Sequence, residues 1–141
     1  MSRIFLDTNI FIYFYEDAGP LSALTRSLLE RLEQRGDQIV TSTLTIGELL
    51  VHPLRTGNEK LAGLYEQVLQ PPAIEIIPFD RACAASFARL RLDTSIKPPD
   101  AIQLACAAAG RCDLFITNDS RLTGKIVPGL QFIAAIDKVP L

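Results

Sequence analysis

Four acidic residues stand in separate segments of the sequence, at positions where they could act together. Asp7 and Asp119 each directly follow a short apolar run of the kind that forms a buried strand. Glu48 and Asp100 each lie in the first turns of a segment expected to be helical. In open α/β sheets, ligands bind outside the carboxyl ends of the strands, where the following helices also begin. The four carboxylates could therefore converge on one crevice.

Carboxylates that converge in this way favour a particular chemistry. Each one raises the pKa of its neighbours and destabilises the fold unless a cation is bound. Hard oxygen ligands without histidine or thiolate select Mg²⁺ or Mn²⁺. Two such ions about 3.5–4 Å apart can hold the attacking water and the leaving oxygen of a phosphodiester. The pattern thus indicates a metal-dependent hydrolase acting on phosphodiester bonds.

Each of these acids also has an ordinary structural interpretation. Asp100 follows two prolines and could be an acid favoured at a helix N-terminus by capping and by the helix dipole. Glu48 could close a capping box that begins at Thr45. Asp119 could form an Asx-turn or cap a short helix. Asp7 is the hardest to explain structurally, because a charge at the end of a buried strand is costly unless a cation or hydrogen-bond donors compensate it.

Alternating strands and helices must position these residues. Strands are expected at 4–6, 38–41, 74–77 and 114–117, with a short final one near 131–133. Helices are expected at 10–15, 20–35, from Thr43 onward, at 61–69, at 81–92 and at 98–109. Gly36 ends the second of these helices, Pro53 weakens the third, and Asp80 caps the fifth. This order predicts an α/β fold with a mainly parallel central sheet of four to five strands and helices on both faces.

Length and composition limit the classes of function. The 141 residues predict a single domain, 1–141. The net charge of −2 argues against binding nucleic acid by a basic surface alone, although phosphates could still be reached through metal ions. His52 is the only histidine, which excludes catalysis built on several histidines and leaves one residue for any Ser-His-Asp triad. Three cysteines without a paired spacing predict buried thiols in a reducing compartment. With no signal peptide or membrane span in the sequence, the expected location is the cytoplasm.

Four segments together resemble one known family. They are Phe5-Leu6-Asp7-Thr8-Asn9-Ile10, Thr43-Leu44-Thr45-Ile46-Gly47-Glu48-Leu49, the segment from Lys97 to Ala105 around Pro98-Pro99-Asp100-Ala101, and the segment from Leu114 to Leu122 around Thr117-Asn118-Asp119. In this order they resemble the PIN-domain nucleases and, within them, the small toxins of VapBC-type toxin–antitoxin modules. The resemblance spans nearly the whole chain, and all four segments in order are far more specific than any one of them.

The resemblance implies a PIN-like fold and a Mg²⁺- or Mn²⁺-dependent endoribonuclease. Asp7, Asp100 and Asp119 would be the main metal ligands, and Glu48 would bind a metal directly or through water. The neighbouring polar residues that would orient ligands or water are Thr8, Asn9, Thr117 and Asn118. One or two metals would activate a water that cuts RNA in line, leaving a 5′-phosphate without the 2′-hydroxyl as nucleophile.

The resemblance also implies partners. Such toxins usually form homodimers and are silenced by an antitoxin whose C-terminal segment lies across the active-site groove. The apolar segment 10–15 could be part of a partner surface, or it could pack in the core of this chain.

Other readings of the sequence fit less well. A receiver-like signalling domain needs a phosphorylatable aspartate after a central strand, but the second strand ends at Thr41-Ser42. A haloacid-dehalogenase-type phosphatase needs a second acid where Asn9 stands. An RNA-processing PIN nuclease without an antitoxin stays open. So does an inactive PIN module that binds RNA or protein, although the presence of all four acids argues against it.

Overall fold

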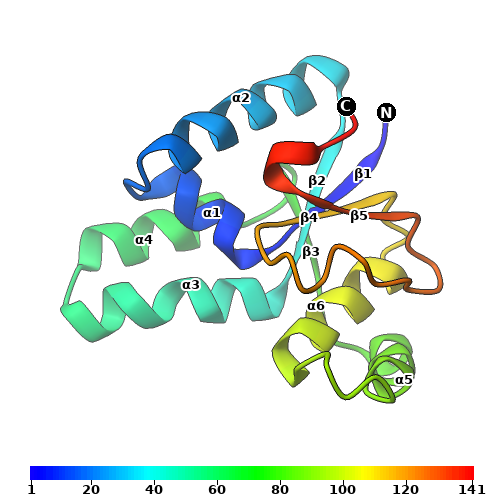
Figure 1. The fold of residues 1–141 in the computed structure, drawn as a ribbon. Helices are drawn as coiled ribbons and strands as arrows, with labels where there is room; N and C mark the ends of the chain where they lie inside the picture. The colour runs from blue at the N-terminus through cyan, green and yellow to red at the C-terminus, as the bar shows by residue number, and fades with distance from the viewer.

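The computed structural model describes all 141 residues and contains one five-stranded sheet (Figure 1). The strands are β1 (Arg3–Leu6), β2 (Gln38–Ser42), β3 (Ile74–Ile77), β4 (Leu114–Thr117) and β5 (Phe132–Ala135). Their order is β3-β2-β1-β4-β5, and every neighbouring pair is parallel. The predicted parallel sheet is confirmed, and the first strand of the chain lies at its centre.

Helices cover both faces of the sheet, as predicted. In Figure 1, α1 (Thr8–Tyr15), α2 (Pro20–Arg35), α3 (Thr43–Thr56) and α4 (Glu59–Val68) lie on one side, and α5 (Arg81–Leu90) and α6 (Pro98–Ala109) on the other. Side chains of a strand alternate between the faces. Ile4 and Leu6 of β1 accordingly pack into the core with α1 to α4, while Phe5 packs into the core with α5 and α6. The central strand thus anchors two separate cores.

The segment 10–15 belongs mainly to the core. Ile10 and Phe11 are fully or almost fully buried, and the aromatic residues after them are half-buried. Tyr15 packs edge to face against Tyr65 of α4. Ile12 is the exposed residue of this segment. Most of its apolar surface is therefore used within this chain.

Local signals set most element ends. Gly36 and Gly57 stop α2 and α3 in the left-handed conformation, with φ of +73° and +70°. Asp80 caps α5 by accepting a hydrogen bond from the Cys83 N–H at 3.0 Å. Several element ends differ from the expected ones by about two residues: α1 begins at Thr8, α4 begins at Glu59, and α5 ends at Leu90 rather than near residue 92. The helix α3 passes Pro53, where weakening was expected, and continues to Thr56. A 3₁₀ turn, η1 (Ile136–Lys138), follows β5, and none of the helices has the length and apolar character to cross a membrane.

Candidate active site at the carboxyl edge of the sheet

Asp7 stands at the end of the central strand and caps the helix that follows. Its main-chain N–H donates to the carbonyl of Ile116 at 3.0 Å, which continues the pairing of β1 with β4. Its Oδ1 accepts from the Thr8 N–H and its Oδ2 from the Thr117 hydroxyl, both at 2.8 Å. The residue is 8% exposed and forms no salt bridge. Asp7 is therefore a buried carboxylate held in place by hydrogen-bond donors but not by a cation.

Electrostatics at Asp7 disfavour its charged form. Burial raises the pKa of the Asp7 carboxyl to about 6, and the hydrogen bonds from Thr117 and Thr8 only partly oppose this shift. The charges of Asp100 and Glu48 raise the pKa further. Glu48 lies close to Asp7, because Thr8 donates to Asp7 through its main-chain N–H and to Glu48 through its hydroxyl. No ion pair compensates the charge of this buried acid.

Glu48 lies in α3 and faces the start of α1. The N-cap of α3 is Ser42, whose hydroxyl accepts from the Thr45 N–H at 3.3 Å, so the alternative of a capping box from Thr45 to Glu48 is not adopted. Glu48 Oε1 instead accepts from the Thr8 hydroxyl at 2.6 Å. Thr8 thereby contacts one of the four acids and lies beside another, Asp7.

Gln103 of α6 is a site residue that the sequence analysis did not identify. It is 2% exposed, and its Nε2 donates to the Thr45 hydroxyl at 2.7 Å, to the Thr8 hydroxyl at 3.2 Å and towards Glu48 Oε1 at 3.4 Å. Its Oε1 accepts from the Ser42 hydroxyl. Buried side-chain amides require such partners. A glutamine within the otherwise apolar stretch 101–109 was the signal that could have identified it.

Asp100 lies in the first turn of α6, which begins at Pro98. The N-cap of α6 is Lys97, so Asp100 is not a capping residue. Its carboxylate is half-buried and forms no salt bridge. Burial raises its pKa, as does the charge of Asp119, whereas Arg121 and Lys97 lower it. Asp100 therefore shares its surroundings with Asp119.

Asp119 follows β4 and is held by a cation of its own chain. Its Oδ1 accepts from Arg121 Nε at 2.9 Å and from the Arg121 N–H at 3.0 Å, and its Oδ2 accepts from Arg121 Nη2 at 2.6 Å. The main-chain contact is the Asx-turn that the sequence suggested. The Arg121 guanidinium holds the pKa of the Asp119 carboxyl below its ordinary value.

The four predicted supporting residues divide into two pairs. Thr8 and Thr117 contact the acids directly, at Glu48 and Asp7 respectively. Asn9 and Asn118 instead join α1 to the loop after β4. Asn9 Oδ1 accepts from the Asn118 N–H at 3.3 Å, and Asn118 Nδ2 donates to the Tyr13 hydroxyl at 2.8 Å. Asn9 and Asn118 therefore fix the position of the loop that carries Asp119.

The donor set suits a hard divalent cation, although the side chains do not form a closed set of ligands. No three acidic, histidine or cysteine side chains lie close enough together to hold a metal ion. Glu48 is engaged by Thr8, and Asp119 is engaged by Arg121. All the candidate donors are oxygens, and Asp7 is a buried carboxylate without a cation. Mg²⁺ and Mn²⁺ are the cations that bind oxygen ligands of this kind and would neutralise such a carboxylate.

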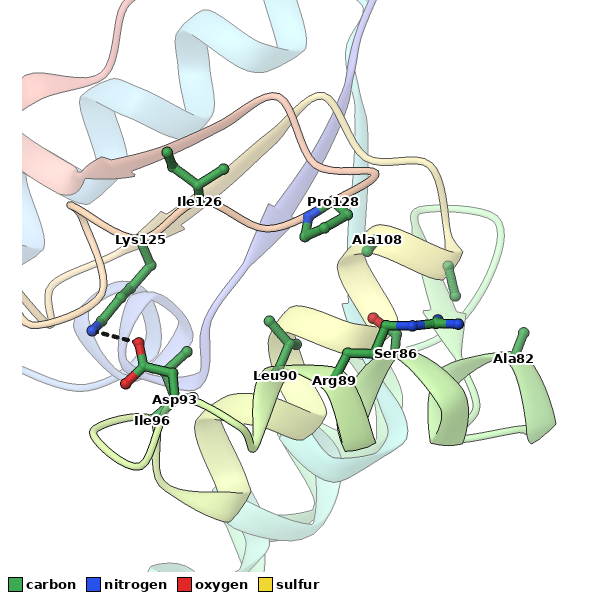
Figure 2. Close-up of a pocket in the computed structure, with 11 residues that line it drawn as sticks. Ala82, Ser86, Arg89, Leu90, Asp93, Ile96, Ala108, Lys125, Ile126 and Pro128 are labelled. Atoms are coloured by element: carbon green, nitrogen blue, oxygen red, sulfur yellow. Dashed lines mark hydrogen bonds and ion pairs between the residues drawn. The ribbon is translucent and has the colours of Figure 1, made fainter.

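The acids lie apart from the pocket between α5, α6 and the segment before β5, which has a volume of about 410 Å³ (Figure 2). Leu90 and Ile96 line it, and Lys125 pairs with Asp93 at its rim at 2.9 Å. None of the pockets of this structure is lined by any of the four acids. The acidic site is thus part of an open edge.

A family model described as "PIN domain" matches residues 4–125. This chain belongs to the PIN domain family. The matched residues run from β1 to beyond β4 and include all four acids, so the resemblance inferred from the four segments is confirmed. Membership of the PIN family supports the expected nuclease function.

Solved structures share the PIN fold over nearly the whole chain. A chain of VapBC2 from Rickettsia felis, bound to a DNA fragment from the promoter, superimposes with a TM-score of 0.74 at 20% identity, covering 94% of this chain and 98% of that one. DNA-bound VapBC from Salmonella typhimurium gives 0.74 at 18% identity, covering 96% and 99%. A toxin–antitoxin complex from Klebsiella pneumoniae gives 0.65 at 25% identity, covering 90% and 94%. A search of curated proteins finds no match to this sequence.

Proposed function

We propose that this PIN domain is a Mg²⁺- or Mn²⁺-dependent endoribonuclease and the toxin of a VapBC-type toxin–antitoxin module. The observation that carries the proposal is Asp7, a buried carboxylate without a cation, beside Asp100 and Glu48 at the carboxyl edge of a PIN fold. A divalent cation would remove the electrostatic cost of gathering these charges. The open edge also suits a polymer, which must pass across the site rather than enter it.

Asp7, Asp100 and Asp119 are the proposed metal ligands, with Glu48 acting directly or through water. A bound divalent cation supplies a Lewis acid that lowers the pKa of a water molecule and offsets the charge of the phosphodiester. Thr117 and Thr8 hold the two oxygens of Asp7, which fixes the orientation of that carboxylate. Hydrogen-bonded partners of this kind orient metal ligands.

Glu48 is proposed to position water. Thr8 and Gln103 both approach its Oε1, at 2.6 and 3.4 Å, which leaves Oε2 available to accept a hydrogen bond from water or to bind a cation. Because Gln103 is itself held by Ser42 and Thr45, the direction of the Glu48 carboxylate is set before any substrate arrives. A preorganised base or water-holding group of this kind needs no rearrangement during the reaction.

The proposed partners are an antitoxin and a second copy of the chain. The similar complexes from Rickettsia felis and Salmonella typhimurium are described as VapBC, and that from Klebsiella pneumoniae as toxin–antitoxin. Ile12 of α1 and Val51 and Leu54 of α3 are exposed apolar side chains on two helices that pack against each other. Such apolar surface suits a protein partner. The proposed place of action is the cytoplasm, where RNA substrates are found.

The test is incubation of purified, partner-free protein with total cellular RNA in Mg²⁺ or Mn²⁺. Discrete cuts are expected that disappear with EDTA and in Asp7→Asn, with 5′-phosphate ends. A 2′-deoxy nucleotide at the mapped cut is expected to leave cleavage intact. If folded protein that binds Mn²⁺ leaves all RNA uncut, the nuclease proposal fails and the PIN domain is better explained as a binding module.

A further inference from the structure

Arg121 uses both oxygens of Asp119, the acid at the carboxyl end of β4. Its Nε and main-chain N–H both donate to Oδ1, and its Nη2 donates to Oδ2. Asp119 therefore cannot offer a carboxylate edge to a cation while the guanidinium stays in place. In this arrangement Arg121 supplies the positive charge that a metal ion would supply.

Arg121 is also placed to meet a substrate. Its side chain is 60% exposed, and it lowers the pKa of Asp100 as well as that of Asp119. Lys97, at the start of α6, acts on the same two acids. Two cations from different segments thus border the acidic site. Arg89 and Lys125 line the pocket of Figure 2, which contains none of the four acids, and Lys125 is paired with Asp93.

The Asp119 carboxylate stays oriented when the guanidinium is removed. The Arg121 N–H bond to Oδ1 belongs to the main chain and does not depend on the side chain. Exposed ion pairs contribute little stability, so this side chain can change partners at small cost. The guanidinium fork that fits a carboxylate bidentately also fits two phosphate oxygens.

We propose that Arg121 changes partners during function: it holds Asp119 in the metal-free protein and binds an RNA phosphate once a divalent cation has taken Asp119. This inference rests on the proposed nuclease function. It makes Arg121 both a competitor of the metal and a substrate-binding residue. The two roles predict effects of opposite sign when the side chain is removed.

The test compares Arg121→Gln with wild type and with the control Arg89→Gln, whose side chain lines the pocket of Figure 2. Mn²⁺ binding without RNA is measured by the electron paramagnetic resonance signal of free Mn²⁺. Arg121→Gln is expected to bind Mn²⁺ about two- to fivefold more tightly, since an exposed ion pair no longer competes. Arg89→Gln is expected to match wild type. An unchanged or weaker Mn²⁺ affinity in Arg121→Gln would overturn the proposal.

RNA binding is measured with a labelled single-stranded RNA oligonucleotide in Ca²⁺, with gels to verify that the RNA stays intact. Arg121→Gln is expected to weaken binding by about tenfold or more and to reduce the slope of log K against log salt by about 0.7, as for the loss of one phosphate contact. Arg121→Lys keeps the charge without the fork and is expected to retain the salt slope. If Arg121→Gln leaves either the RNA affinity or the slope of log K against log salt unchanged, the proposed exchange of partners is wrong.

Wild type is titrated first, so that the two proposals can fail separately. Folded wild-type protein that binds no Mn²⁺ contradicts the proposed metal-dependent nuclease itself. If wild type binds Mn²⁺ and cleaves RNA, and Arg121→Gln binds Mn²⁺ equally well, only the proposed role of Arg121 is contradicted.

Discussion

The Thr117 hydroxyl donates to Asp7 Oδ2 at 2.8 Å and joins two residues that lie 110 positions apart in the chain. The same hydroxyl oxygen accepts from the Asp119 N–H at 3.0 Å. One side chain at the end of β4 therefore orients the carboxylate of Asp7 and the main chain of Asp119.

Replacing Thr117 by valine tests this link. Valine keeps the volume and removes the hydroxyl, so Asp7 loses a donor that stabilises its charged form. We expect about 10- to 100-fold weaker Mn²⁺ binding, as is typical when the partner of a metal ligand is lost. Mn²⁺ titrations of Thr117→Val and Thr117→Ser measure this, and the serine variant is expected to stay close to wild type. Equal affinities of the valine variant and wild type would contradict the role of Thr117.

Asp7 gives the metal-free protein a characteristic pH dependence. Its pKa is raised from 3.8 to about 6, so the folded state prefers the protonated form. The associated stability is fully present below pH 3.8 and is lost as the pH rises to about 6, up to about 3 kcal/mol in all. We expect Asp7→Asn to be more stable than wild type in EDTA above pH 6, with the difference shrinking towards pH 4. Urea unfolding of both proteins across this range checks it, and a difference independent of pH would refute it.

Gln103→Met tests the buried hydrogen-bond network. Methionine matches the length of glutamine but cannot bond to Ser42, Thr45 or Glu48. We expect a loss of about 1–3 kcal/mol in unfolding free energy, because buried partners are left unsatisfied. RNA cleavage is expected to require a higher Mg²⁺ concentration, since Glu48 keeps the donor on Thr8 but loses the one on Gln103. Gln67→Met, on the exposed side of α4, is the matched control, and the proposed role fails if both variants behave alike.

Metal binding should stabilise the fold through Asp100. We expect Mg²⁺ at about 100 times its Kd to raise the unfolding free energy by about 2.7 kcal/mol in wild type. Asp100→Asn should lose most of this gain. Asp93→Asn, which removes an acid paired with Lys125 at the pocket of Figure 2, should keep this gain. Thermal unfolding with and without Mg²⁺ measures the difference, and an equal gain in Asp100→Asn would exclude Asp100 as a ligand.

The fold was largely predictable because its signals are local. Apolar runs and caps such as Asp80 are set within a few residues, and parallel strands bring Asp7 and Asp119 to the same edge. Pro53 was expected only to weaken α3, and the helix continues to Thr56, because a proline late in a helix removes only one hydrogen bond while the packed helix around it persists. Local rules therefore gave the order of elements but not every boundary.

The partners within the site could not be predicted in the same way. The bond between Thr8 and Glu48 and the contacts of Gln103 join residues from three helices, and their spacing in the sequence carries no periodic signal. Arg121 carries no motif signal in the sequence, because a charged side chain close to an acid is usually a solvated surface residue. Only the tertiary structure shows that it occupies both oxygens of Asp119.

The position of β1 between the two cores makes the length of the first strand a design constraint. One inserted residue would exchange the faces to which Ile4, Phe5 and Leu6 point and would move Asp7 by about 3.3 Å along the sheet. The segment 122–131 lies outside the strands, but Leu122, Val127 and Leu130 are buried in the core with α5 and α6. Gly124 is exposed and has open space around it, so an insertion at this residue leaves that core and Asp7 in place. Engineers who wish to attach a tag or a sensor to this PIN domain have a suitable insertion point there, whereas the first strand must keep its length.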